Sequence, residues 1–418
     1  MNKRLFIVFI LGFSSGLPMA LISSTLQAWY AASGLSVLAI GALSLVSLPY
    51  AYRFFWGPIL DRYSLFSLGK RRSWILSMQI LLLLGFNLMA WFSPEQYPKL
   101  LAFLALAIAC FSATQDVAID AHRAEYLPVN EHGLGASLAV FGYRLALLIS
   151  GGLALIMAEH LGWAFTYRFM GFLMTLGMLA IFFSQEPTAE INTQASFTES
   201  FIEPLKELFT RPHILYLVLF IICYKLGEAF TTTTSGIVMP FLIQGLGFSL
   251  ETIGYINKIL GVISVLLGGL SAGFILMRYS LYCSLFCFGL LQALTNVLFV
   301  ILAIVGKNVT VLAVAVFFDN FAAGLGSTAL VALFMRLVDK RFTGTQFSML
   351  VALSTLPRIF SGPFAGWLQL HLGWVGLYEL SIAFALLFIP FLMLIKGYTE
   401  EGESSMVGIG FCKLDKVS

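Results

Sequence analysis

Residues 73–92 read SWILSMQILLLLGFNLMAWF and contain no charged side chain. A helix needs about 20 consecutive apolar residues to cross the hydrocarbon core of a bilayer. The rest of the chain has the same character, because 59% of its 418 residues are hydrophobic and only 11% are charged. A soluble domain carries about 25% charged residues. The composition therefore predicts a membrane protein with many spans, and it excludes a soluble enzyme and a single-span anchor.

Eleven similar apolar stretches accompany this one along the chain. In lipid, every backbone N–H group needs a partner within its own helix or barrel, and these stretches lack the alternation of barrel strands. We therefore expect an all-α integral membrane protein with twelve transmembrane helices. The twelve predicted helices lie at about residues 4–30, 37–60, 73–93, 99–124, 134–158, 163–184, 213–244, 251–277, 280–306, 309–336, 344–370 and 374–396.

The positive charges predict how the chain crosses the membrane. If the N-terminus is cytoplasmic, sixteen Lys and Arg residues fall on the cytoplasmic side and five inside the membrane, while only Lys99, Arg168 and Lys307 fall on the opposite side. Lys and Arg concentrate in the cytoplasmic loops of membrane proteins. Both termini are therefore predicted to be cytoplasmic. The net charge of +3 is too small for nucleic-acid binding by electrostatics alone.

The two halves of the sequence resemble each other. Residues 160–163 and 371–374 both read HLGW, and Gly34 and Ser36 have counterparts 213 positions later. Two halves in parallel orientation are typical of the major facilitator transporters, whose substrate site lies between them near the membrane midplane. We expect an N-terminal six-helix half at residues 1–184, a cytoplasmic linker at 185–212, a C-terminal six-helix half at 213–396 and a short cytoplasmic tail at 397–418.

A polar loop follows the second predicted helix. Residues 57–62 read GPILDR and residues 69–72 read GKRR. Apart from an insertion between the two motifs, this arrangement resembles the loop between the second and third helices in the major facilitator superfamily. The resemblance implies that the loop latches the two halves together on the cytoplasmic side, although residues 70–72 could equally serve to set the topology. The predicted cytoplasmic gate comprises Asp61, Arg62, Arg71, Asp120 and Arg123, with Asp120 pairing with Arg62 or Arg71.

Further motifs occur in order along the chain, namely GFSSGLP at 12–18, TLQAW at 25–29, ATQD at 113–116, GYR at 142–144 and YKLGE at 224–228. As a set they resemble the AmpG-type muropeptide permease family over about residues 4–396. The resemblance implies a multi-pass protein of the bacterial inner membrane that imports anhydromuropeptides (GlcNAc-anhydroMurNAc-peptides) from the periplasm in symport with protons. It implies no cofactor beyond the proton gradient, and we expect a monomer. Glu228 stands where the family pattern leads us to expect Asp.

Eight charged residues lie inside the predicted helices, five of them cations and three of them carboxylates. A charge at the centre of a bilayer costs about 2.5 to 3.5 kcal/mol on insertion scales and therefore indicates a functional site. An anionic substrate would balance the excess positive charge, since Arg can hold a peptide carboxylate through two hydrogen bonds. The alternative is that these cations form ion pairs within the helix bundle and do not bind substrate. The candidate substrate-binding residues are Gln27, Tyr143, Arg144, Lys225, Asn257, Lys258 and Arg358.

The carboxylates inside the membrane are candidates for proton coupling. A proton carrier must bind its proton from one side and release it to the other, which suits a carboxylate whose surroundings change as the halves rock. Lys225 and Glu228 lie three residues apart on one helix face, so that they can form an ion pair. The proton-coupling candidates are Asp116, Glu228 and Asp319, in no fixed order.

Two other functions compete with muropeptide import. Acetyl-coenzyme A transporters are distantly similar, so the substrate could be another bulky anion, and a non-transporting membrane receptor could keep the same fold. An enzyme is disfavoured, because the sequence shows no phosphate-binding loop, no His pair at metal-ligand spacing and no Ser with a reachable base. We therefore expect no metal site and no enzymatic activity.

Overall fold

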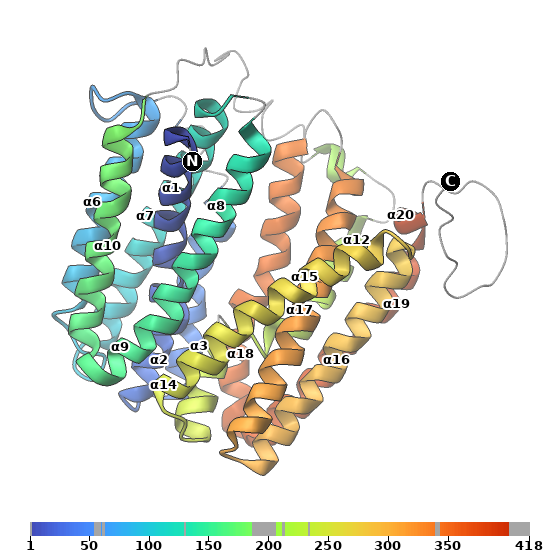
Figure 1. Ribbon diagram of the computed structural model, residues 1–418. Helices are drawn as coiled ribbons and strands as arrows, with labels where there is room; N and C mark the ends of the chain where they lie inside the picture. Colours follow the sequence, from blue (N-terminus) through green and yellow to red (C-terminus); the bar gives the residue numbers. More distant parts are fainter. Residues whose placement is uncertain are drawn as a thin grey trace.

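The computed structural model describes residues 2–53, 60, 63–128, 131–185, 206–210, 214–232, 235–338 and 343–400. Its elements are all helices, and Figure 1 shows the N-terminal helices, blue to green, beside the C-terminal helices, yellow to red. We call α1 to α10 the N-terminal bundle and α12 to α19 the C-terminal bundle. Helix α1 begins at the same end of the structure at which α20 lies, the upper end in Figure 1.

Three of the helical segments in the N-terminal bundle are built from shorter pieces. A π-helical segment lies between α1 and α2 and another between α8 and α9, and a 3₁₀ segment lies between α3 and α4. The elements are α1 (Lys3–Ala20), η1 (Leu21–Thr25), α2 (Leu26–Ala32), α3 (Val37–Ala42), η2 (Leu43–Ser47), α4 (Leu48–Ala51), α6 (Lys70–Met89), α7 (Pro98–Tyr126), α8 (His132–Leu147), η5 (Leu148–Leu153), α9 (Ala154–Leu161) and α10 (Trp163–Phe183).

The C-terminal bundle repeats this pattern, with π-helical segments before α15 and after α13. Its elements are α12 (Ile214–Ala229), α13 (Val238–Pro240), η6 (Phe241–Gly245), α14 (Leu250–Ile253), η7 (Gly254–Leu260), α15 (Gly261–Leu276), α16 (Leu281–Val305), α17 (Val309–Leu337), α18 (Thr343–Leu386) and α19 (Phe388–Leu394), followed by the short α20 (Lys396–Glu400).

Among the described residues, nine helices are long and apolar enough to cross a membrane, and the chain is a multi-pass membrane protein. The longest apolar stretch, Gln346–Leu394, bends at Gly373, where φ is +67°. It therefore contains two of the predicted helices. The prediction of one unbroken helix over 213–244 is wrong, because α12 ends at Ala229 and helical structure resumes only at Val238.

Matching positions in the two halves of the sequence have matching local structures. Gly34 and Gly247 both adopt positive φ, and Ser36 and Ser249 both accept a hydrogen bond from a backbone N–H group three residues later. These are N-cap contacts, which satisfy one of the free donors at the start of a helix. The internal repeat seen in the sequence therefore corresponds to the same turn and helix start in each bundle.

The two bundles contact each other near the end at which α2, α9 and α14 lie, the lower end in Figure 1. Helix α3 packs on α18, and the backbones approach so closely that a Cβ atom on Gly41 would overlap the carbonyl oxygen of Gly362. Small residues let helices pack this closely within a membrane. Gln244 also donates to the carbonyl oxygens of Ala31 and Leu35 across the contact, at 2.9 Å each.

Candidate substrate and coupling site

The first cluster of membrane charges lies in the N-terminal bundle, where α7 packs on α1. Asp116 of α7 accepts a 2.6 Å hydrogen bond from the Ser15 hydroxyl of α1. The Arg53 guanidinium lies 3.9 Å from its other carboxylate oxygen, and only 7% of the Asp116 side chain is exposed. The carboxylate is thus held between one hydroxyl group and one cation.

Tyr143 lies at the point where the charges of both bundles converge. The charges of Asp116, Arg53, Arg144 and Arg358 all act on its phenol, and Arg358 is the one that belongs to the C-terminal bundle. The Tyr143 hydroxyl itself contacts the Met19 sulfur at 3.1 Å. Three of the predicted substrate ligands, Tyr143, Arg144 and Arg358, are thus brought together. The Tyr143 phenol is within electrostatic range of three guanidinium groups and one carboxylate, a net positive environment that favours an anion.

The second cluster lies in the C-terminal bundle and centres on an ion pair within α12. The Lys225 ammonium lies 2.8 Å from Glu228 Oε1, which confirms the pairing expected from their spacing. Lys225 also donates to the Ser327 hydroxyl of α17 at 2.8 Å, and Gln292 of α16 donates to Glu228 Oε2 at 3.0 Å. The ion pair is therefore bound by two further helices, and its side chains are only 11% and 15% exposed.

Asp319 of α17 lies next to this ion pair and is 4% exposed. The Thr295 hydroxyl donates to Asp319 Oδ1 at 3.5 Å, and the Thr231 hydroxyl and the Glu228 charge also act on its carboxyl group. Its surroundings therefore differ from those of Asp116 and Glu228, each of which faces a cation.

Thr231 belongs to a break in the helical structure that the sequence analysis missed. Helix α12 ends at Ala229, and the Ser361 hydroxyl donates to the carbonyl oxygen of Ala229 at 3.2 Å. Gly236, within the break, has a φ of +86°. Irregular backbone at membrane depth is tolerated only inside protein or along a cavity. The signal in the sequence was the polar run TTTTSG at 231–236 within an otherwise apolar stretch.

Lys258, expected to bind substrate, lies between the two bundles. Its ammonium donates to the Ser24 hydroxyl of η1 at 2.5 Å, and its methylene groups pack over Gly151 and Gly152 of η5. Three π-helical segments meet here, a type of irregularity that is frequent at functional sites. The structure therefore places Lys258 in the contact that joins the bundles.

The other two polar candidates are also buried in α2 and η7. Gln27 is 0% exposed and Asn257 is 5% exposed, so neither presents an open surface in this structure. The Asn257 side-chain oxygen has no hydrogen-bond partner among the described residues. We place both residues with Lys258, on the elements that bring the bundles together.

The ion pairs at the opposite end differ from those predicted for the cytoplasmic gate. Arg71 pairs with Glu125 at 2.6 Å, and Asp120 pairs with Arg123 at 3.0 Å on its own helix. The predicted pairing of Asp120 with Arg71 is therefore wrong in this structure, because Glu125 lies one helical turn nearer the end of α7. Asp61 and Arg62 lie outside the described residues.

Residues 5–362 match the sequence profile of the Major Facilitator Superfamily. The chain belongs to this superfamily. Within it, the chain is of the same family as the anhydromuropeptide permease of Escherichia coli K12, with 40% identity over 411 residues that cover 98% of this chain and 82% of the relative. A putative transporter AmpG 4 of Rickettsia felis is 31% identical over 92% of this chain and 94% of its own.

Solved structures of low sequence identity share the fold. A bacterial homologue of the human lysosomal transporter Spinster, in an inward-facing and occupied conformation, has a TM-score of 0.73 at 13% identity and covers 96% of this chain and 98% of its own. A nucleoside transporter, NupG, has a TM-score of 0.70 at 14% identity, with 96% and 100% coverage. The all-helical transporter fold expected from the sequence is therefore confirmed, and the chain is a transporter by family and fold.

Proposed function

We propose that this protein imports anhydromuropeptides across the bacterial inner membrane, from periplasm to cytoplasm, in symport with protons. The observation that carries the substrate class is the excess positive charge near Tyr143, whose phenol is within electrostatic range of Arg53, Arg144 and Arg358, from both bundles. A muropeptide brings peptide carboxylates that such guanidinium groups bind well. The family relationship to a permease of this specificity supports the same substrate.

In this proposal the chain crosses the membrane twelve times, as two six-helix halves at residues 1–184 and 213–396 with both termini in the cytoplasm. Helix starts and turns that repeat between the bundles support the division into halves. The location of α1 and α20 at one end supports an even number of spans. The linker at 185–212 and the tail at 397–418 then lie on the cytoplasmic side.

Substrate binding falls to Arg144, Arg358 and Tyr143, which lie between the bundles, and Lys225 adds a further cation. The Tyr143 ring offers a flat surface for a sugar ring or a peptide group. Because Arg358 belongs to one bundle and Arg144 to the other, an anion bound to both would couple the positions of the two halves. This arrangement suits a carrier whose halves rock about a central site.

Proton coupling falls to Asp116, Glu228 and Asp319. Each lies beside groups from a second helix, so that a relative movement of helices changes its hydrogen bonds. Asp319 contacts hydroxyl groups and faces the Glu228 carboxylate. A carboxyl group whose neighbours change in this way can bind a proton in one conformation and release it in the other.

The conformation supports alternating access. Polar contacts between the bundles join Ser24 to Lys258, and Ser44 donates to the Ile359 carbonyl oxygen at 2.5 Å. Glu159 and His160 contact the start of α14, the first through the Leu250 N–H group at 3.0 Å. These contacts all lie toward the end that the proposed topology places at the periplasm. In this proposal the structure is closed there and corresponds to a state from which substrate leaves to the cytoplasm.

The test is uptake of labelled anhydromuropeptide into membrane vesicles with an imposed proton gradient. We expect the labelled anhydromuropeptide to accumulate, and accumulation should stop when the gradient is collapsed. Competing free peptides that lack the sugar should not abolish it. Arg168→Ala, which removes a cation far from the Tyr143 cluster, is the matched control for Arg144→Ala. Uptake of acetyl-coenzyme A instead would identify a carrier for another bulky anion. Absence of any gradient-dependent uptake would support a non-transporting receptor.

A further inference from the structure

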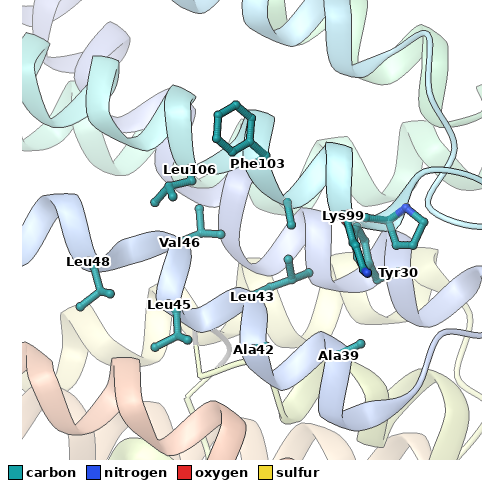
Figure 2. A pocket seen from close by; sticks show the side chains of 12 residues that line it. Tyr30, Ala39, Ala42, Leu43, Leu45, Val46, Leu48, Lys99, Phe103 and Leu106 are labelled. Atoms are coloured by element: carbon teal, nitrogen blue, oxygen red, sulfur yellow. The ribbon is translucent and has the colours of Figure 1, made fainter.

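A groove on the surface of the N-terminal bundle has no place in the proposed transport cycle. It lies between α3–η2 and α7, and its volume is about 450 Å³. Figure 2 shows Lys99 beside Tyr30 at one end of the groove and Leu48 at the other. One wall carries Ala39, Ala42, Leu43 and Val46, and the small side chains of the two alanines make room between the helices.

The opposite wall is one face of α7. Lys99, Ala102, Phe103 and Leu106 follow the spacing at which side chains line one face of a helix. Seven residues of α-helix span about 10 Å, so the groove extends about 10 Å along the helix axis from Lys99 to Leu106. Phe103 is 68% exposed and Leu106 is 39% exposed, so this apolar groove opens to the outside of the bundle.

The position of the groove determines what can fill it. The chain spans a bilayer, so an apolar opening on a transmembrane helix faces acyl chains. Lys99 lies in the first turn of α7, two residues after the exposed Tyr97. Aromatic and basic side chains at the end of a transmembrane helix mark the depth of the lipid headgroups. Lys99 is thus at headgroup depth, and the apolar walls extend from it toward the membrane centre.

We propose that the groove is a binding site for an anionic phospholipid. One acyl chain lies between α3–η2 and α7, and the phosphate lies against the Lys99 ammonium. An acyl chain matches the shape and the apolar lining, while the single cation at the mouth matches a negatively charged headgroup. Because η2 also carries Ser44, which bonds the Ile359 carbonyl oxygen of the other bundle, the lipid supports the helix that forms the contact between the bundles.

Native mass spectrometry of the purified protein tests the proposal, with phosphatidylglycerol or phosphatidylcholine added at equal concentration. Wild type should retain one phosphatidylglycerol molecule in preference to phosphatidylcholine. Lys99→Ala should lower that retention about fivefold, the loss expected for one cation at a lipid surface. Ala42→Trp, which fills the groove, should abolish retention of this lipid. Two control variants lie outside the groove. Lys307→Ala removes an exposed cation, Leu294→Trp enlarges an exposed apolar side chain, and both should retain the lipid as wild type does.

A second measurement covers the case in which Ala42→Trp folds poorly. Phosphatidylglycerol should raise the thermal unfolding temperature of wild type, because a ligand that binds only the folded state stabilises it. The milder Ala39→Leu should reduce this rise, and Leu294→Trp should not. Equal phosphatidylglycerol retention by wild type, Lys99→Ala and Ala42→Trp would overturn the proposal. So would a dimer that dissociates in Ala42→Trp, since a second copy of the chain would then occupy the groove.

Discussion

The two bundles hold their buried carboxylates in different ways. In the N-terminal bundle, Asp116 lies between unbroken stretches of α1 and α7, and its cation, Arg53, comes from a different segment. In the C-terminal bundle, Glu228 has its cation, Lys225, on the same helix, and the helix ends one residue later. Among the described residues, Arg144 and Arg358 form no ion pair, whereas Arg53 and Lys225 each lie beside a carboxylate.

This difference indicates that the two bundles, although they share one architecture, have different roles in substrate binding and proton coupling. Excess positive charge from Arg144 of one bundle and Arg358 of the other acts at Tyr143, and this suits an anionic substrate. The break after α12 places Thr231 against Asp319, beside Glu228. A segment without helical hydrogen bonds can change its conformation at lower cost than a helix, so this region suits the step that couples proton binding to movement. The predictions below test this difference in roles.

The largest expected effect is loss of substrate binding at the Tyr143 cluster. Arg144→Ala and Arg358→Ala should each lower muropeptide uptake about 100-fold, because loss of a charged hydrogen bond in a buried site costs about 2 to 5 kcal/mol. Arg144→Lys should keep partial uptake, since Lys preserves the charge but not the planar fork. Uptake into vesicles that contain equal amounts of each variant in the membrane measures this effect. Wild-type uptake by both Ala variants would remove the two residues from the site.

The C-terminal ion pair should affect stability more than substrate binding. Lys225→Met alone should destabilise the protein by about 3 kcal/mol, because it leaves Glu228 charged and unpaired in a buried position. The double variant with Glu228→Gln should recover most of that loss. Thermal unfolding in detergent measures both, and Arg168→Met serves as the control. If the double variant is no more stable than Lys225→Met, the two residues do not act as a pair.

Neutral substitutes for the carboxylates separate coupling from binding. Asp319→Asn and Glu228→Gln should lose uptake driven by a pH difference yet keep counterflow driven by internal substrate, since a neutral side chain mimics the protonated state. Asp116→Asn should impair both activities if its role is to position the guanidinium groups around Tyr143. Retention of pH-driven accumulation by all three variants would place the proton carrier elsewhere.

The contact at Gly41 and Gly362 should control which end of the transporter opens. Gly41→Leu inserts a side chain where the two backbones touch, so it should favour the state in which this end is open. A cysteine at Gln244, which lies in the contact, should then react several-fold faster with an impermeant thiol reagent on intact cells. Gly273→Leu, at a glycine where a Cβ meets nothing within 4 Å, should leave that rate unchanged.

The smallest perturbation tests the topology alone. In a variant whose five native cysteines are replaced by Ser, Gln96→Cys and Ser67→Cys each place a single thiol at an exposed position, at opposite ends of α6, and neither should change transport. On intact cells an impermeant reagent should label the thiol at 96 and not the one at 67. The reverse pattern would overturn the assignment of sides that rests on the positive charges.

The fold class was predictable from composition and patterning alone. Backbone groups in lipid can satisfy their hydrogen bonds only within helices or closed barrels, so long uncharged runs such as residues 73–92 leave few alternatives. Features within one helix were also predictable, since Lys225 and Glu228 needed only their spacing to be recognised as a pair. The repeated turns at Gly34 and Gly247 were predictable for the same reason, because the residues that start a helix lie next to one another in the sequence.

Features that depend on how helices rotate against one another were decided by the tertiary structure. Asp120 and Glu125 are both near the end of α7, and only the packing of α6 on α7 determines that Arg71 reaches Glu125. Lys258 has the same charge as Arg144 and Arg358, and only the packing of η7 against η1 determines that it reaches Ser24 of the other bundle.

The break after Ala229 shows the same limit. An apolar run reports that a segment is surrounded by lipid or protein, but it does not report whether neighbouring helices supply partners for an unwound backbone. Here Ser361, more than a hundred residues away, supplies one of them. Hydrophobicity therefore determines where the chain enters the membrane, whereas long-range packing determines which buried polar groups meet and form a site.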